Sequence, residues 1–288
     1  MKNHPDADGI LYICGPLFQY MIVNMITGIL METVWSYSPG RQVPAGIAAA
    51  ESYSILGVWS YLCLIIPAGA GCLCVRREAG RSLAWCRRHR IPAADLPTGA
   101  LSVLFVAVIC LSLGINFLVS LVSGHSGVSS GLAAALPGTA GFVLAALVYG
   151  IYMPFIEEIL FRGILFSRMK EVLTRRRSDE AFGTQAAGTD MRDEWTAVMI
   201  SAALFGLYHG AVLQGIYAFV MGLVFAVAYG YTGRFSVPWG LHGACNLCIL
   251  LLQRTDRYQA ICTPAWTAAF FVLAAAGFYT VWRLQKNA

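Results

Sequence analysis

Long apolar stretches that carry almost no charge run through most of this chain. A helix needs about 20 such residues to cross the hydrocarbon core of a bilayer. Eight segments approach or exceed that length: roughly Ile10–Met31, Ser54–Val75, Gly99–Val122, Gly141–Phe166, Trp195–His209, Ala211–Tyr231, Val237–Gln253 and Pro264–Trp282. They predict an all-α, polytopic transmembrane bundle of about eight spanning helices. The fifth segment is short, which favours a tilted or fully buried helix, and a count of seven arises if the fifth and sixth fuse near residues 209–210.

Composition supports a lipid environment for most of the chain. Of the 288 residues, 58% are hydrophobic and 12% are charged, whereas soluble domains carry about 25% charged residues. A soluble fold could not bury that much apolar surface. We therefore expect one transmembrane domain over 1–288, with a core at about 141–252, variable N-terminal helices at 10–122 and a C-terminal helix at 264–282.

Positive charge gathers between particular segments and predicts the orientation. Arg76–Pro97 holds six arginines, Arg168–Glu194 holds six Lys or Arg residues, and Ser123–Ala140 holds none. Because Lys and Arg favour the cytoplasmic side, the two basic segments should be cytoplasmic loops, the second of them mobile. Both termini are then cytoplasmic, although Arg254 and Arg257 fall on the opposite side. The clustering indicates topology signals rather than a nucleic-acid surface.

Few ionisable or strongly polar residues lie deep inside the apolar segments. A charged side chain at the bilayer centre costs roughly 2.5–3.5 kcal/mol on insertion scales, and such residues usually face the interior and have partners. Function is therefore the first hypothesis for each of them. The Asp, Glu, Lys, Arg or His residues among them are Glu157, Glu158, Arg162, His209 and His242, and Asn246 lies one helical turn after His242.

Helical spacing predicts how these side chains relate. Residues four apart lie on one face of a helix, so Glu158 and Arg162 should pair directly. Glu157 is turned about 100° from Glu158 and can address another group. His242 and Asn246 share a face and can converge on one point.

Four of these residues could together activate water. A glutamate in a low-dielectric pocket is a competent base near neutral pH, so Glu157 could deprotonate a water that His209 holds. His242 and Asn246 could supply hydrogen-bond donors to an oxyanion. Glu157, His209 and His242 also match a zinc ligand set with an open fourth position. The sequence does not separate the two mechanisms.

Three short motifs carry a resemblance to a known family. Residues 157–162 read EEILFR, residues 205–209 read FGLYH and residues 242–246 read HGACN. Their order and spacing resemble the EExxxR, FxxxH and HxxxN motifs of the type II CAAX prenyl endopeptidase family, which includes bacteriocin-processing relatives. The resemblance covers about Gly141–Leu252, and the ordered set is far more specific than any one motif.

The resemblance implies an eight-helix intramembrane peptidase with a cavity open toward the cytosol. It implies that Glu157 activates water with His209, and that His242 and Asn246 stabilise the oxyanion. The other two charged residues of the first motif become a supporting pair. Family members have been described as metal-dependent and as glutamate-dependent; we favour the glutamate mechanism, with zinc as the alternative cofactor.

The expected partners are the lipid bilayer and a membrane-anchored peptide or protein substrate, with no nucleic acid. Short loops and compact size suggest a bacterial plasma-membrane protein. Bacteria generally lack prenylated substrates, so we expect this protein to share the family's reaction but not its prenylated substrate. Peptide or bacteriocin maturation, self-immunity and cleavage of membrane-anchored partners are the alternatives.

Three other readings of the same residues stay open. The charged triad could be a structural ion network, and the histidines could be hydrogen-bonded core residues. A proton-coupled transporter also buries Glu, His and Arg, but no matching inverted repeats are visible. A catalytically silent relative could act as a binding or immunity protein. The nine cysteines lack metal-ligand spacing and are expected to be small buried hydrophobes.

Overall fold

The described part of the chain is almost entirely helical. A computed structural model describes residues 9–37, 49–89, 97–124, 138–180, 190–255 and 257–286, and these contain no strand. The prediction of an all-α fold is confirmed. Outside the fourth apolar segment the helices are α1 (Gly9–Ser36), α2 (Ala49–Arg88), α3 (Thr98–Ser123), α7 (Met191–Tyr208), α8 (Val212–Thr232), α9 (Ser236–Arg254), α10 (Tyr258–Ile261) and α11 (Pro264–Lys286).

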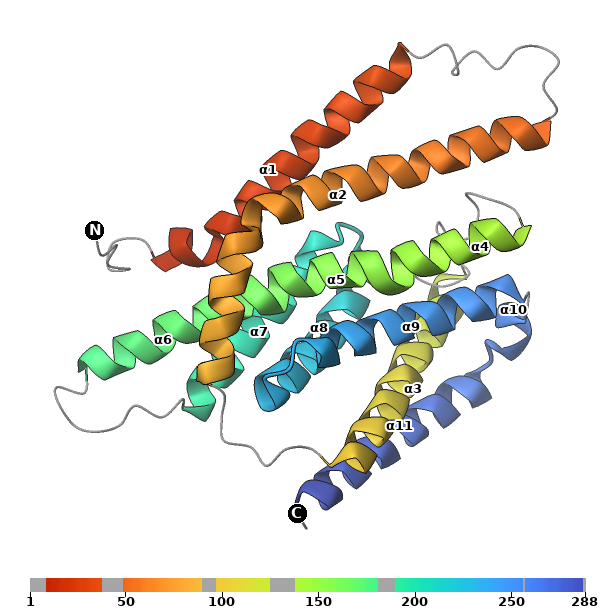
Figure 1. Cartoon of the computed structure of the whole chain (residues 1–288). Helices are drawn as coiled ribbons and strands as arrows, with labels where there is room; N and C mark the ends of the chain where they lie inside the picture. The colour runs from red at the N-terminus through yellow and green to blue at the C-terminus, as the bar shows by residue number, and fades with distance from the viewer. Residues whose placement is uncertain are drawn as a thin grey trace.

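The fourth apolar segment forms one continuous helical stretch that crosses the molecule (Figure 1). It comprises α4 (Gly138–Leu147), η2 (Val148–Tyr152), α5 (Met153–Glu158), η3 (Ile159–Phe166) and α6 (Ser167–Glu180). The η2 and η3 segments are π-helical, with hydrogen bonds that reach five residues back rather than four. Such widened turns occur often at functional sites, and these two flank the paired glutamates.

Each predicted span corresponds to one long helix, but not all are apolar enough to cross a membrane alone. Among the described residues, α1, α2, α3, the stretch 138–177, α8 and α11 meet that criterion. The remaining two are α7, which carries Arg192, Asp193 and Glu194 in its first turn, and α9, which carries two of the motif residues. Eight spans is thus an approximate count, with six supported by length and composition.

The two basic segments are largely helical, which corrects their prediction as loops. Helix α2 bends and continues to Arg88 (Figure 1), and α6 continues to Glu180. The continuation of α2 buries Val75, Ala79 and Cys86 at helical spacing, so one face packs on the bundle while the arginines face outward. Residues 181–189, where a mobile loop was predicted, lie outside the described residues, as do residues 125–137 of the uncharged connection.

Ion pairs tie these helical extensions to one another. Lys170 Nζ lies 2.6 Å from Glu194 Oε2 and is fully buried. Arg168 pairs with Glu78 of α2 and also bonds the backbone carbonyl of Tyr12 in α1. The basic residues of α6 therefore hold α1, α2, α6 and α7 together, in addition to any effect of their charge on the orientation of the protein in the membrane.

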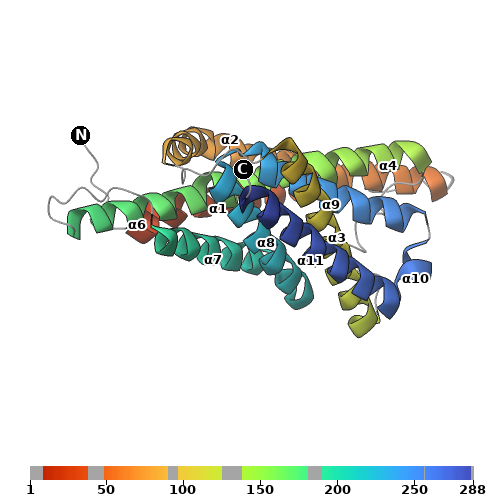
Figure 2. The same cartoon turned by 90° about the horizontal axis from the view of Figure 1, so that it is seen from below.

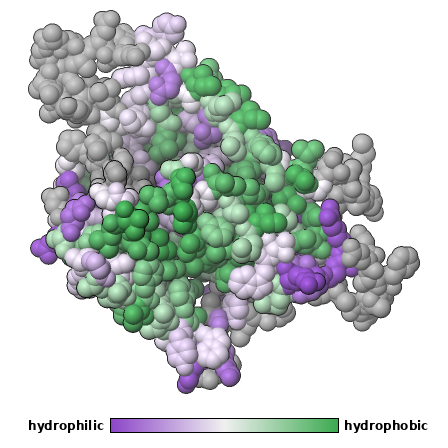
Figure 3. Space-filling view, turned by 180° about the vertical axis from the view of Figure 1, so that it is seen from behind, coloured by the Kyte–Doolittle hydropathy of each residue, from purple (hydrophilic) through white to green (hydrophobic). Residues whose placement is uncertain are grey.

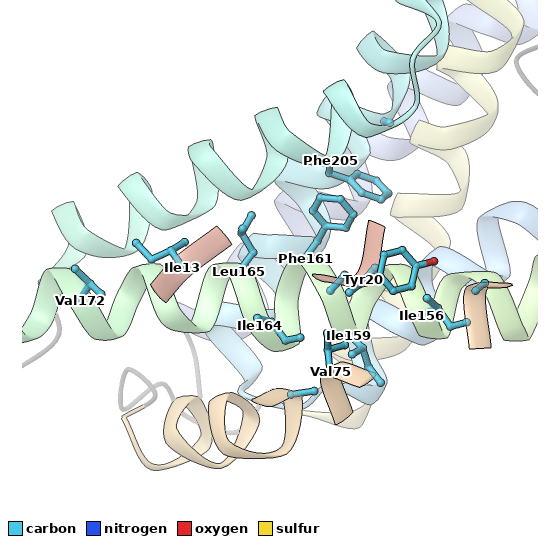
Figure 4. Packing of buried hydrophobic residues seen from close by; sticks show 14 residues of the cluster. Ile13, Tyr20, Val75, Ile156, Ile159, Phe161, Ile164, Leu165, Val172 and Phe205 are labelled. Atoms are coloured by element: carbon cyan, nitrogen blue, oxygen red, sulfur yellow. The ribbon is translucent and has the colours of Figure 1, made fainter. Parts of the chain in front are cut away.

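Helix pairs build the rest of the bundle: α1–α2 and α7–α8 pack on the long central stretch, whereas α3–α11 packs on α8 and α9. Helices α1 and α2, α3 and α11, and α7 and α8 lie side by side (Figures 1 and 2). One apolar cluster joins α1, α2, the central stretch and α7, and Figure 4 shows Tyr20, Ile156, Phe161 and Phe205 within it. This packing fixes the helix positions on which the candidate site depends.

The outer surface remains strongly apolar. Figure 3 shows hydrophobic residues over the middle of one face, with hydrophilic residues toward its margins. Exposed side chains include Val122, at 76% exposure, and Val212, at 79%. Apolar surface this extensive is costly in water, whereas lipid solvates it. Together with the six apolar helices, it identifies an integral membrane protein.

Candidate active site

A cavity of about 190 Å³ lies among the central stretch, α3, α7, α8 and α9. All four predicted catalytic residues line it, from three separate parts of the chain. The lining residues are Asn116, Tyr149, Met153, Glu157, Phe205, Tyr208, His209, Gln214, Tyr217, Ala218, Met221, Phe225, His242, Asn246, Leu250 and Gln253. The three motifs thus meet at one place, as their chemistry requires.

Glu158 and Arg162 form the pair that helical spacing predicts. Arg162 Nη1 donates to Glu158 Oε1 at 2.9 Å, and both side chains are fully buried. The structure adds a third member, because His242 Nδ1 lies 2.9 Å from the same Glu158 oxygen. A buried charge needs both a partner and hydrogen bonds, and Glu158 receives them from two helices.

Aromatic rings and a backbone carbonyl complete the surroundings of Arg162. Its guanidinium lies 4.5 Å from the ring centre of Phe205 and 5.4 Å from that of Phe225, so cation–π attraction compensates part of its desolvation. Nη2 donates to the carbonyl of Gly222 at 2.9 Å. Phe225 also stacks on His242, with ring centres 5.1 Å apart. The motif phenylalanine Phe205 therefore packs against charge as well as against apolar neighbours.

Glu157 points into the cavity instead of joining this pair. Its Oε2 lies 3.7 Å from His242 Nε2, and its side chain is 13% exposed. His209 and His242 are both close enough to interact electrostatically with the carboxylate. The two adjacent glutamates thus have different surroundings. Glu158 is fully buried and does not line the cavity, whereas Glu157 lines it and can contact a molecule bound there.

His209 caps the C-terminal end of α7 and is oriented by its own helix. Its Nδ1 lies 2.8 Å from the carbonyl oxygen of Phe205. Because a carbonyl only accepts, Nδ1 carries the proton, and a neutral ring keeps its lone pair on Nε2. Gly210 follows with a φ of 73°, a left-handed conformation that suits glycine and reverses the chain directly after the histidine.

The π-helical turns make backbone carbonyls available to neighbouring helices. Asn246 Nδ2 donates to the Tyr149 carbonyl at 2.9 Å, and Trp239 Nε1 donates to the Ile151 carbonyl at 3.0 Å. In lipid, freed backbone groups must find such partners. These bonds fix α9 against the central stretch and orient the Asn246 amide, whose second N–H is available to another acceptor.

A close approach between two glycines sets the position of α9. A Cβ at Gly243 would stand 2.2 Å from the carbonyl oxygen of Gly150, and a Cβ at Gly150 would stand 2.5 Å from Leu247. Small residues at such crossings let helix backbones approach closely in membranes. Gly243 directly follows His242, so this contact helps to place the histidine beside the glutamates.

The three residues that the sequence suggested as zinc ligands are not arranged as a ligand set in the structure. Within the described part of the chain, no group of three His, Cys, Asp or Glu side chains has an arrangement that could hold a metal ion. Glu157, His209 and His242 do line one cavity.

Comparison with known proteins supports the resemblance suggested by the motifs. Residues 139–248 match the sequence model of the family described as Type II CAAX prenyl endopeptidase Rce1-like. This segment is therefore similar to the type II CAAX prenyl endopeptidase family. The match contains all three motifs and nearly the whole predicted core, and leaves out α1, α2, α3 and α11. No curated protein and no solved structure matched the chain.

Sequence reasoning did not anticipate two parts of this site. The bond from His242 to Glu158 joins residues 84 positions apart, and the Tyr149 carbonyl became available to Asn246 through a widened turn that carries no motif. The small residues around His242 were the available signal. Gly240, Gly243 and Ala244 leave α9 with little side-chain bulk on part of its surface, which is typical of a close helix crossing.

Proposed function

We propose that this protein is an intramembrane endopeptidase of the CAAX-protease type, in which Glu157 activates the attacking water. One observation carries the proposal. A single cavity is lined by Glu157, His209, His242 and Asn246. The buried Glu158–Arg162 pair lies next to it, and Glu158 is hydrogen-bonded to Nδ1 of His242. A structural ion network alone would not need four polar side chains around a hollow.

In the first step, water attacks the carbonyl carbon of the scissile peptide bond. Glu157 takes the proton, and its partly enclosed position strengthens it as a base relative to a carboxylate in water. His209 accepts a hydrogen bond from the same water through Nε2, because its Nδ1–H is held by the Phe205 carbonyl. Holding the water between two acceptors directs its lone pair at the substrate.

The second set of residues stabilises the charge that develops on the carbonyl oxygen. His242 donates from Nε2, and Asn246 donates its second amide N–H, to the oxyanion of the tetrahedral intermediate. A carboxylate on the far ring nitrogen stabilises an imidazolium, as it does in catalytic triads, and Glu158 occupies that position. The C–N bond then breaks, and Glu157 returns the proton to the leaving nitrogen.

Membrane-anchored peptides or proteins are the proposed substrates, because the site lies inside a bundle with an apolar exterior. A substrate tethered in the same bilayer meets the protein at a high effective concentration. This substrate class is compatible with maturation of a membrane-bound peptide, and it does not require a prenyl group.

The direct test is hydrolysis by the purified protein in liposomes. Membrane-anchored peptides of varied sequence are incubated with it in H₂¹⁸O, with and without a metal chelator, and the products are weighed by mass spectrometry. We expect a single cut that places one ¹⁸O atom in the new carboxyl group and that persists with chelator. Stoichiometric zinc with chelator-sensitive cleavage would replace the glutamate mechanism by a metal-dependent one.

Two outcomes would support the competing functions. Tight peptide binding without ¹⁸O incorporation would favour a silent binding or immunity protein. Proton uptake coupled to movement of a solute across the liposome would favour a transporter. Either result, with no cleavage of any peptide, would contradict the peptidase proposal.

A further inference from the structure

Residues 76–88 form the last part of α2, beyond the apolar part of that helix. We call them the arginine segment. The segment runs across the central stretch (Figure 1), on which α2 packs at η3. Its first turn is tied to α6 by the pair between Glu78 and Arg168. Near its end, Cys86 shares a buried cluster with residues at the beginning of α7 and the end of α8. The segment therefore lies across one end of the bundle.

The buried and the charged residues of the arginine segment lie on opposite sides of the helix. At 100° per residue, the buried positions Ala79, Ser82 and Cys86 fall within about 60° of one another. A separate arc of about 140°, centred nearly opposite, carries five exposed arginines. They are Arg76, Arg77, Arg81, Arg87 and Arg88. The arc otherwise holds Gly80 and Ala84, whose small size leaves space between the guanidinium groups.

Neighbouring carboxylates neutralise little of this charge. Within the described part of the chain, one ion pair involves the five arginines, from Arg81 Nη1 to Glu78 Oε1 at 3.2 Å, and the Arg81 side chain is still 77% exposed. Glu78 is shared with Arg168, so a single carboxylate serves two cations. Arg88 Nε donates to the backbone carbonyl of Ala84 in its own helix. Most of the guanidinium donors thus face outward, toward an external anion.

The position of the arginine segment matches the membrane boundary. Leu73 and Cys74, just before it, are exposed and apolar, so the lipid-facing part of α2 ends where the arginines begin. Trp85, at the edge of the arc and half-buried, is a residue type enriched at membrane–water interfaces. The outward face of the segment is therefore at the level of the lipid headgroups.

We propose that the arginine segment is a docking surface for the headgroups of anionic phospholipids. An anionic membrane surface attracts basic residues next to a spanning helix, and a guanidinium group can donate two parallel N–H bonds to one phosphate. Residues 76–88 extend over about 18 Å at 1.5 Å per residue, so they reach more than one headgroup. The inference does not depend on the proposed peptidase function.

A protein partner fits this surface less well than lipid does. Protein interfaces are organised around aromatic or aliphatic anchors at their centre. The arc carries arginines, one glycine and one alanine, so it offers charge but no such anchor. A layer of headgroups requires only the charge.

The test measures lipid binding to the purified full-length protein. The protein in neutral-detergent micelles is titrated with phosphatidylglycerol or with phosphatidylcholine, and bound lipid is measured by native mass spectrometry. We expect the wild type to bind phosphatidylglycerol at least about tenfold more tightly at low ionic strength. High ionic strength should remove most of this preference, because salt screens exposed charges.

Matched variants locate the binding surface. Replacing Arg77 and Arg87 together by glutamine should weaken phosphatidylglycerol binding about 30-fold, which is about fivefold for each lost surface charge. Replacing the same two residues by lysine keeps the charge and should keep the affinity within about threefold of the wild type. The control removes two other exposed arginines, by Arg254→Gln with Arg257→Gln, and should also stay within about threefold.

Three outcomes would overturn the proposal. Equal losses of affinity in the two double glutamine variants would show that the arginine segment is not the binding surface. Equal binding of phosphatidylglycerol and phosphatidylcholine would exclude recognition of the anionic headgroup. Displacement of the lipid by glycerol phosphate or by a soluble acidic peptide, at concentrations comparable to that of the lipid, would assign the surface to a soluble anion or to a protein partner. Failure of both competitors to displace the lipid would support the membrane as the ligand.

Discussion

His242 Nδ1 lies 2.9 Å from Glu158 Oε1, the same oxygen to which Arg162 donates. One buried carboxylate therefore links the first and third motifs across two helices. The pairing of Glu158 with Arg162 belongs to a single helix and stabilises it locally. The hydrogen bond to His242 gives the pair a second role, because this bond orients the imidazole ring that lines the cavity.

Removing the Glu158 carboxylate should destabilise the protein strongly. Glu158→Ala leaves Arg162 buried without its counter-charge, which typically costs 3–5 kcal/mol. Unfolding by denaturant titration in mixed micelles measures the loss. Arg81→Ala is the control, because it breaks an exposed pair with Glu78 and should cost at most about 1 kcal/mol. Equal stability of the two variants would contradict the assigned role.

The double variant Glu158→Met, Arg162→Met separates stability from positioning. Replacing a whole buried ion pair by apolar residues is often neutral for stability, so unfolding should return toward that of the wild type. Cleavage should remain impaired, because His242 has lost its Nδ1 partner. Recovery of both properties would show that the pair is purely structural.

The contact between α9 and the central stretch should tolerate no added methyl group. Gly243→Ala places a Cβ against the Gly150 carbonyl, so α9 must shift and carry His242 with it. Displacements of about 1 Å at a catalytic centre can cost 10²-fold in rate. Gly15→Ala, with no atom near its Cβ, should keep full activity. A similarly active Gly243→Ala variant would show that the close approach does not position the site.

A thiol mechanism is not expected, because no cysteine lines the cavity in the described residues. Replacing all nine cysteines by alanine should leave kcat within a few-fold of the wild type, and thiol-blocking reagents should not inhibit. Complete loss in any single variant that remains folded would reopen nucleophilic catalysis by that residue.

The cysteine-free protein also allows a test of orientation, which is still a prediction. Arg87 at the end of α2 and Thr255 after α9 are both exposed, and the charge distribution assigns them to opposite sides of the membrane. In intact cells, an impermeant maleimide should label Thr255→Cys but not Arg87→Cys. The reverse pattern would place the arginine-rich ends outside.

Much of the fold and several contacts could be predicted from the sequence because they depend on local periodicity. Apolar runs predicted the eight long helices, and spacing of four predicted the Glu158–Arg162 pair. The basic segments were assigned to loops because their charge outweighed apolar positions such as Ala79 and Cys86, which the structure buries. Tertiary packing decides whether those positions are buried or exposed, and a local sequence pattern carries no information about that packing.

The candidate site was harder to predict from the sequence, because its geometry joins residues that lie far apart in the chain. The sequence nominated Glu157, His209, His242 and Asn246, but not the Tyr149 carbonyl that holds Asn246. That carbonyl is available because a π-helical turn changes the backbone bonding, and no residue type marks such a turn. The cavity lining likewise includes residues of α3, α8 and α9 that belong to no motif.

The central claim is that the Glu157 carboxylate activates water, and Glu157→Gln tests it most directly. The amide keeps the size and hydrogen-bonding reach of the side chain but cannot accept the proton. With a membrane-anchored substrate that the wild type cleaves, we expect kcat to fall about 10²–10⁴-fold, with unchanged membrane insertion and peptide binding. Turnover by Glu157→Gln within tenfold of the wild type would contradict the account.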